Sequence, residues 1–276
     1  MPDLVFWTKA YGAWGSFEGN GNAASASRTL GGVLTGADTR LEHGWRLGFA
    51  TGYSQSSVEV DGRGSSASVD TVHLAAYAGG ALGPAVLRSG AAWGWNSIDT
   101  TRAVVFPGFS EQEAASYDGD TGQVFGELAL PTSWLGMFAE PFAGLAYVHV
   151  GSGGFAESGP LAGLTGAAAS DDVGYSTLGL RLASTSCVEG VNVTSRASAA
   201  WQHAFGDVTP EAALAFAAAG SAFVVGGVPI AEDSALLEAG LDVALSPAAM
   251  LEVSYFGQLA AGAQDNAVEG RFKWAF

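Results

Sequence analysis

The residues of this sequence that could do chemistry are charged side chains at alternate positions in otherwise apolar stretches. Arg181, for example, lies between Leu180 and Leu182. Successive side chains of a β-strand point to opposite faces, so this spacing separates a charged face from an apolar one. The charged set is Glu127, Glu140, Arg181, Arg196, Glu238, Asp242, Glu252, Glu269, Arg271 and Lys273. Two interpretations are open: a hydrated ion-pair network that fixes strand register, which we favour, or carboxylates that act on or grip a threaded segment.

Two stretches fit the alternation less cleanly. Glu140 shares its parity with Phe138 and Phe142, and both faces of the stretch 6–14 carry aromatic side chains. We assign Glu140 to the charged face and leave the orientation of the stretch 6–14 open.

Catalytic and metal-binding motifs are missing from the sequence. It contains no G-x-S-x-G nucleophile elbow, and its Gly-x-Gly pairs lack the third glycine of a dinucleotide fingerprint. The four histidines are scattered without metal-ligand spacing, and Cys187 is the only cysteine. We therefore expect no catalytic residue, no metal site and no cofactor.

Composition argues against two further classes of protein, those that bind nucleic acid and those with transmembrane helices. Acidic residues outnumber basic ones 27 to 11, for a net charge of −16, so nucleic acid is an improbable partner. No uninterrupted run of about 20 strongly apolar residues could form a transmembrane helix. A membrane protein with this sequence would have to be a β-barrel, because only helices and closed barrels satisfy every backbone group in lipid.

The periodicity predicts an all-β chain of twelve strands, many of them longer than the usual 5–6 residues. Their approximate ranges are about 5–17, 27–42, 44–60, 67–82, 85–104, 114–131, 135–155, 171–184, 189–206, 234–246, 248–261 and 266–276. Longer connections, such as 106–113, 156–170 and 207–233, follow odd-numbered strands, and tight turns follow even-numbered ones. These features together predict a transmembrane antiparallel up-and-down barrel with a polar lumen.

The longest connection, 207–233, is apolar in its middle. It could form a hairpin that projects from the barrel or a lid folded over its mouth. The part 212–219 has a helical composition, although the surrounding glycines and prolines argue against a long helix.

The last predicted strand has the sharpest separation of faces. Phe272, Trp274 and Phe276 share its apolar face, and Glu269 and Arg271 lie on the charged one. In a barrel the aromatic face would contact lipid, and the charged face would line the lumen.

Six stretches together resemble the C-terminal β-domain, or translocator, of bacterial type V autotransporters, and the resemblance extends over nearly the whole chain. They are 6–12, 45–48 with 52–54, 140–147, 177–181, 201–207 and 272–276. The resemblance implies a twelve-stranded barrel in the outer membrane of a Gram-negative bacterium that helps to carry an N-terminal passenger to the cell surface. It implies that Phe276, with Phe272 and Trp274, forms a C-terminal signal read by the barrel-assembly machinery.

The implied partners are the lipid bilayer, the chain's own N-terminal passenger and the assembly machinery, and we expect a monomer. In this family a helix before the first strand plugs the pore, and some members cleave the passenger with lumen acids and an asparagine of that helix. Only residues 1–5 precede Phe6, so we expect the passenger, the signal peptide and most of the helix to lie upstream, and self-cleavage transfers to no residue here.

We therefore predict a translocator that is not an enzyme. One alternative is the barrel part of a surface esterase or protease, or of a self-cleaving autotransporter; an upstream nucleophile or cleavage asparagine would favour it. The other is a stand-alone porin or adhesin, which would have a signal peptide directly before Phe6 and no passenger.

Overall fold

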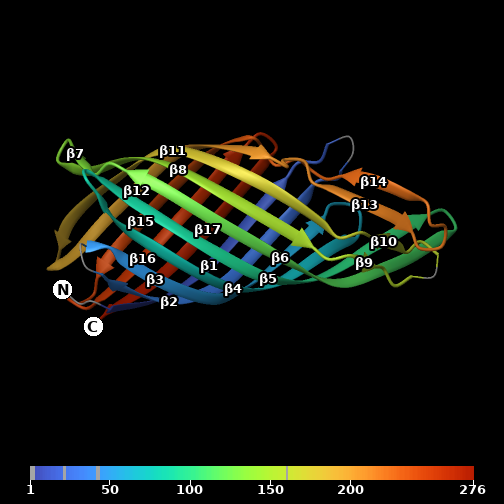
Figure 1. Cartoon of the computed structure of the whole chain (residues 1–276), viewed down its shortest axis with the longest axis horizontal. Coiled ribbons are helices and arrows are strands. Elements are labelled where there is room, and N and C mark those ends of the chain that lie inside the picture. Colours follow the sequence, from blue (N-terminus) through green and yellow to red (C-terminus); the bar gives the residue numbers. More distant parts are fainter. Residues whose placement is uncertain (1–3, 21–22, 42–43, 160) are drawn as a thin grey trace.

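The computed structural model describes residues 4–20, 23–41, 44–159 and 161–276, and its secondary structure is built from β-strands (Figure 1). The described part contains no helix long and apolar enough to cross a membrane. The wall strands are β1 (Leu4–Phe17), β2 (Ala26–Arg40), β3 (Arg46–Val60), β4 (Ser65–Leu82), β5 (Ala85–Phe106), β6 (Phe109–Ala129), β8 (Met137–Ser152), β11 (Ala169–Val188), β12 (Val191–Gly206), β15 (Asp233–Ala244), β16 (Ala249–Ala260) and β17 (Ala263–Ala275).

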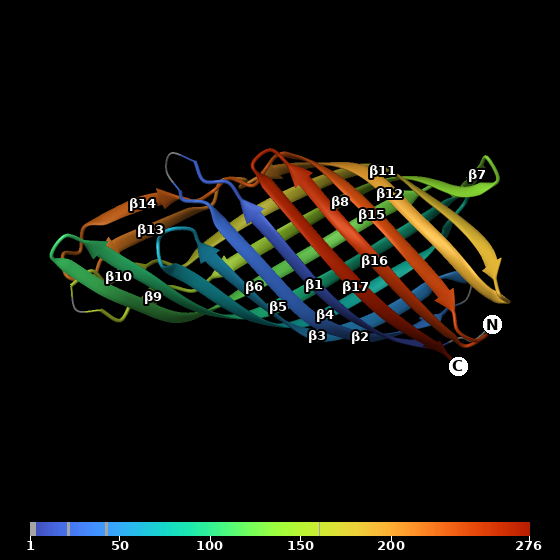
Figure 2. The same ribbon diagram turned by 180° about the vertical axis from the view of Figure 1, so that it is seen from behind.

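These strands form one closed antiparallel wall. Each pairs with the wall strands before and after it in the chain, and pairings of β8 with β11 and of β1 with β17 complete the ring. The three-residue strand β7 (Thr132–Trp134) adds only to β8. The prediction of an all-β, twelve-stranded, up-and-down barrel is confirmed. Figures 1 and 2 show the strands inclined to the long axis, with both termini at one end.

The two faces of the wall differ in the size of their apolar side chains. Large apolar side chains are exposed on its outside, among them Phe49, Leu74 and Trp95. The buried apolar residues in the described part are alanines together with Leu164 and Val173. The interior therefore contains no packed core of large aliphatic or aromatic side chains, unlike a soluble β-sandwich.

The orientation of the first strand, left open by the sequence, follows from its two pairings. Phe6 and Trp14 are exposed at 48% and 49%, whereas Trp7 and Lys9 are partly buried on the opposite face. Lys9 lies beside Arg271 of β17 in the register. The even-numbered positions of β1 therefore face outward, and the odd-numbered ones face the lumen.

One expectation about the connections was wrong. The predicted loop 106–113 is instead a tight turn, because β5 continues to Phe106 and β6 begins at Phe109, whose rings stack with centroids 4.7 Å apart. Gly108 supplies the positive φ of 85° that the turn needs. The strands therefore extend beyond the neighbouring wall as a long hairpin.

Of the two alternatives for the connection 207–233, the projecting hairpin is confirmed, and the segment 212–219 belongs to it despite its helical composition. The hairpin is formed by β13 (Glu211–Phe216) and β14 (Ala222–Gly226). The rings of Phe216 and Phe223 contact each other across this hairpin, with centroids 5.4 Å apart. Cross-strand aromatic contact offsets the weak strand propensity of the alanines.

A small second sheet lies beyond the wall, at the end opposite the termini (Figure 1). Its strand order is β14-β13-β10-β9, where β9 is Phe155–Ala156 and β10 is Leu164–Gly166. A bridge between Ala114 and Ser158 connects this sheet to β6. We call this sheet and the projecting part of the β5–β6 hairpin the outer cap.

Candidate functional site: a charged girdle inside the barrel

The first group of interior charges joins four consecutive wall strands. Arg88 of β5 contacts Glu127 of β6 at 2.8 Å and Glu140 of β8 at 2.9 Å. Arg181 of β11 contacts the same two carboxylates at 2.5 and 3.1 Å, and its guanidinium lies 3.8 Å from the ring centroid of Phe142. Two cations and two carboxylates therefore form a closed, charge-neutral group.

Glu140 is the most buried member of this group, with its side chain 3% exposed. Phe142 lies on the same face, under Arg181, whereas Phe138 is exposed at 45%. Ala139 and Glu140 are both buried, so the alternation breaks between Phe138 and Glu140. This break explains why Glu140 faces the interior although Phe138, two residues before it, faces outward.

A second group follows on the next strands. Arg196 of β12 contacts Glu238 and Asp242 of β15 at 3.2 and 2.8 Å. Its Nη2 also donates a hydrogen bond to Oγ of Ser254 on β16, at 3.1 Å. One arginine thereby connects three strands through a planar donor group that suits several acceptors at once.

A third group spans the seam where the ring closes. Lys9 of β1 contacts Glu269 of β17 at 2.8 Å, and Arg271 contacts both Glu252 and Glu269 at 3.3 and 3.4 Å. Lys273 also pairs with Glu252. These contacts connect the first strand to the last two.

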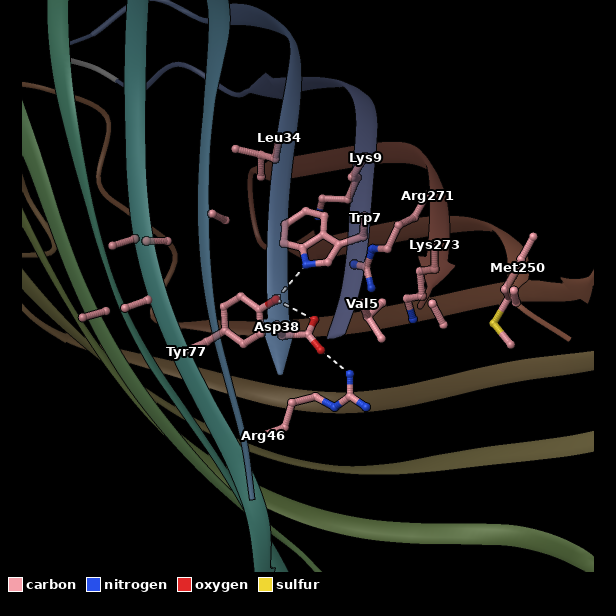
Figure 3. Close-up of a pocket in the computed structure, with 18 of the residues that line it drawn as sticks. Val5, Trp7, Lys9, Leu34, Asp38, Arg46, Tyr77, Met250, Arg271 and Lys273 are labelled. Atoms are coloured by element: carbon pink, nitrogen blue, oxygen red, sulfur yellow. Dashed lines mark hydrogen bonds and ion pairs between the residues drawn. The ribbon is translucent and has the colours of Figure 1, made fainter. Parts of the chain in front are cut away.

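A fourth group joins β1, β2, β3 and β4 (Figure 3). Trp7 donates from Nε1 to the hydroxyl of Tyr77 at 2.7 Å, and this hydroxyl donates to Asp38 at 2.9 Å. Asp38, which is 8% exposed, also pairs with Arg46. The same side chains, with Lys9, line a cavity of about 900 Å³ in the barrel interior.

We call these four groups the charged girdle. Every wall strand contributes at least one side chain to it, and each group ties together the strands that it spans. Partly buried pairs of this kind are costly to break from one side, because the remaining charge is left without a partner. The geometry supports a wet, fixed-register interior, and no group of His, Cys, Asp or Glu in the described residues could hold a metal ion.

All ten charged residues singled out in the sequence take part in the girdle, and their role in function stays a prediction. Seven further members lie outside that set: Trp7, Lys9, Asp38, Arg46, Tyr77, Arg88 and Ser254. Arg88 could have been found, because it lies an odd number of residues from the outward Trp93 and Trp95. Lys9 could not be assigned to the lumen from the sequence, because the orientation of β1 was left open.

The predicted C-terminal signal residues lie side by side along the outer surface of β17. Ring centroids are 6.2 Å apart for Phe272 and Trp274, and 6.3 Å apart for Trp274 and Phe276. Phe276 also meets Phe6 edge-on at 5.7 Å, and its backbone nitrogen donates to the carbonyl of Leu4. Phe276 is nevertheless 69% exposed, so its ring remains available to lipid or to another protein.

Solved structures with the same fold include two autotransporter domains. The translocator domain of NalP from Neisseria meningitidis matches with a TM-score of 0.81 and 15% identity, covering 100% of this chain and 89% of that one. The β-domain of the Bordetella autotransporter BrkA matches with a TM-score of 0.74 and 17% identity, covering 99% and 100%. At these identities the similarity establishes the fold.

Sequence comparison gives the family. The chain is 37% identical over 270 residues to two extracellular serine proteases of Serratia marcescens, covering 98% of this chain but only 26% of each relative. It also matches the sequence model of the autotransporter beta-domain over residues 6–255. The resemblance stated from the six sequence stretches is confirmed, and this chain belongs to the autotransporter β-domain family.

Proposed function

We propose that this chain is a translocator that spans the outer membrane and supports export of an upstream passenger to the cell surface. The observation that carries the proposal is the closed wall of an autotransporter β-domain, apolar outside and lined inside by the charged girdle. Pairing all around the ring leaves no strand edge to face lipid. The girdle keeps the interior attractive to water, as a passage for a polar chain requires.

The passenger is proposed from the extent of the sequence match. Because this chain corresponds to 26% of each Serratia relative, most of each relative lies outside the aligned segment. A protease activity in those proteins fits that remainder, and the girdle residues of this chain are all committed to one another. We infer that the present chain is not itself an enzyme and that any enzymatic activity resides in its passenger.

The experiment that tests export places a secretory signal peptide, an epitope-tagged reporter and a linker before Met1. We expect the reporter on the surface of intact Gram-negative cells, accessible to antibody and to added protease. The control carries the same signal peptide and reporter without residues 1–276. A reporter that stays periplasmic while the barrel is correctly inserted would contradict the translocator and favour a stand-alone porin.

Assembly is proposed to depend on the aromatic end of β17. Deleting Phe276 removes the edge contact to Phe6 and the hydrogen bond to Leu4, as well as the exposed terminal ring. We expect at least a several-fold loss of folded, heat-modifiable protein in the outer membrane. The matched control is Phe106→Ala in the outer cap, which removes an exposed ring elsewhere. Normal insertion of the truncated chain would contradict a terminal recognition signal.

A further inference from the structure

The cavity of about 900 Å³ in the barrel interior has far more basic than acidic side chains in its lining (Figure 3). Four bases line it: Lys9, Arg46, Arg271 and Lys273. Asp38 is the one acidic side chain among the described residues of the lining. Lys9 and Lys273 are also the only two lysines of the sequence. We call this space the basic cavity.

The other carboxylates that pair with these bases lie behind them. The side chains of Glu252 and Glu269 are 9% and 16% exposed, and neither belongs to the lining of the cavity. Their partners Arg271 and Lys273 are exposed at 31% and 34% and do line it. A solute that enters the cavity therefore meets the bases and not these two carboxylates.

The side chains around the basic cavity also carry an excess of positive charge. The four bases pair with three carboxylates, those of Asp38, Glu252 and Glu269, so one positive charge is not compensated. The second group of the girdle is the opposite case, with one arginine for two carboxylates. Positive charge is thus concentrated on one side of the interior.

Arg271 has the weakest contacts of the four bases. Its nitrogens lie 3.3 Å from Glu252 and 3.4 Å from Glu269, beyond the usual range of about 2.7–3.2 Å for an N–H···O bond. Its Nε is buried and has no hydrogen-bond partner among the described residues. Buried polar groups are almost always paired, so a further acceptor is expected here. A guanidinium has five N–H donors and can serve a second anion while it keeps the first.

The remainder of the lining leaves room for that acceptor. It is largely apolar, and small side chains such as Ala50 and Ala75 form part of it. These side chains offer no negative charge that would repel an anion, and they leave space for its water shell. Low-dielectric walls around charge of one sign also concentrate the field and raise the local concentration of counter-ions.

We propose that the basic cavity binds a small inorganic oxyanion of the phosphate class through the four bases that line it. The oxygens of the anion accept charge-assisted hydrogen bonds from guanidinium and ammonium groups, both of which bind phosphate well. The turn 246–248 also lines the cavity, and Ala248 accepts a backbone hydrogen bond from Ala275. The site therefore lies toward the end of the barrel that carries both termini, which faces the periplasm under the proposed function.

The test uses the two lysines as reporters. The purified, folded barrel in a non-ionic detergent is treated with a limiting amount of an amine-acylating reagent, in sodium phosphate or in sodium chloride of equal ionic strength. Peptide mass spectrometry then measures the label at Lys9 and Lys273, with a short lysine peptide in the same reaction as the reference. We expect phosphate to slow labelling of both lysines several-fold relative to the reference. Equal labelling in the two salts would overturn the site.

A variant that adds a negative charge shows where the anion lies. Gln123→Glu places a carboxylate in the lining of the cavity and removes no partner from the girdle, so phosphate should no longer protect the lysines. Gln112→Glu makes the same change on an exposed part of the outer cap and should leave the protection intact. Heat-modifiable mobility checks that both variants are folded. Protection that persists in Gln123→Glu would contradict the proposed position.

Removal of a positive charge gives a second readout, by calorimetric titration of sodium phosphate into the same barrel. Lys273→Gln should weaken phosphate binding several-fold, and Glu252 keeps Arg271 as its partner in this variant. Arg63→Gln, in an exposed turn, makes the same change of charge outside the cavity and should have no effect. Equal affinities for the two variants would overturn the site. Both experiments use the purified chain, so their failure would leave the export proposal untouched.

Discussion

The charged girdle and the outer cap contain the same kinds of side chain in opposite arrangements. In the girdle, Glu140 is nearly buried but contacts two arginines that the chain itself supplies. In the cap, Glu113 is fully buried and has no partner among the described residues. The first arrangement is complete once the strands pair. The second is left with excess negative charge, because Arg102 is already committed to Glu157.

The origin of the two arrangements differs as well. Girdle partners are brought together by strand register, as when Arg181 lies directly opposite Glu140 and Arg88 opposite Glu127. Cap partners come from a strand and from an irregular segment far along the chain. The backbone hydrogen bonds fix the register of the girdle pairs, so we expect these pairs to tolerate substitutions at neighbouring positions better than the cap pairs do. We also expect them to be more sensitive than the cap pairs to loss of a charged partner.

The largest effect is expected for Glu140→Ala in the girdle. It leaves Arg88 and Arg181 sharing Glu127, with part of the interior charge uncompensated, and should destabilise the barrel by about 3–5 kcal/mol. The measurement is the urea midpoint of the purified barrel in micelles. Glu59→Ala is the matched control, because that carboxylate is exposed. A midpoint shift no larger than the control's would show that the girdle contributes little to stability.

A smaller effect is expected for Arg181→Lys. The guanidinium bonds both oxygens of Glu127, and an ammonium group cannot reproduce this two-pronged geometry. Loss of one charge-assisted hydrogen bond should cost about 2 kcal/mol. The same substitution at Arg102 in the cap should leave the unfolding of the wall nearly unchanged. Equal shifts for the two variants would remove the distinction between the regions.

Tyr77→Phe should have a weaker effect still. It removes the hydroxyl that accepts from Trp7 and donates to Asp38, while Asp38 keeps its pairing with Arg46. We expect a loss of about 1 kcal/mol in the free energy of unfolding, measured by tryptophan fluorescence in urea. An unchanged midpoint would mean that water replaces the hydroxyl without loss.

The smallest effect on the wall should follow removal of the β13–β14 hairpin. Replacing residues 211–226 with a short Gly-Ser linker deletes strands that pair with each other and with β10 rather than with the wall. We expect heat-modifiable barrels with a midpoint change equivalent to less than about 0.5 kcal/mol. Loss of insertion would show that the cap supports the wall.

The wall could be predicted from the sequence because lipid and lumen impose opposite demands on alternate residues. That alternation predicted twelve strands and a charged set that includes Arg196 and Asp242. It also contained the signal for Arg88, which was overlooked. Where both faces carry aromatic side chains, as around Trp7, the alternation does not show which face is inward. In the structure, pairing with the last strand decides it.

The cap was not predictable in the same way. Glu113 belonged to an expected loop, and its burial results from contact with a segment more than forty residues later in the chain. The alanines of 212–219 favour a helix by intrinsic propensity, but the hairpin forms because aromatic rings meet across it. Local composition carries little information about such long-range packing.

The seam between β1 and β17 has a kinetic consequence. All other wall contacts join wall strands that follow one another along the chain, whereas this one brings together the first strand, β1, and the last, β17. Ordering a loop that includes nearly the whole chain carries the largest entropic cost, so we expect the seam to close last. Until then both β1 and β17 present unsatisfied edges. The half-assembled barrel is thus an open sheet whose exposed edges need a temporary partner, and the final residues of the chain complete the ring.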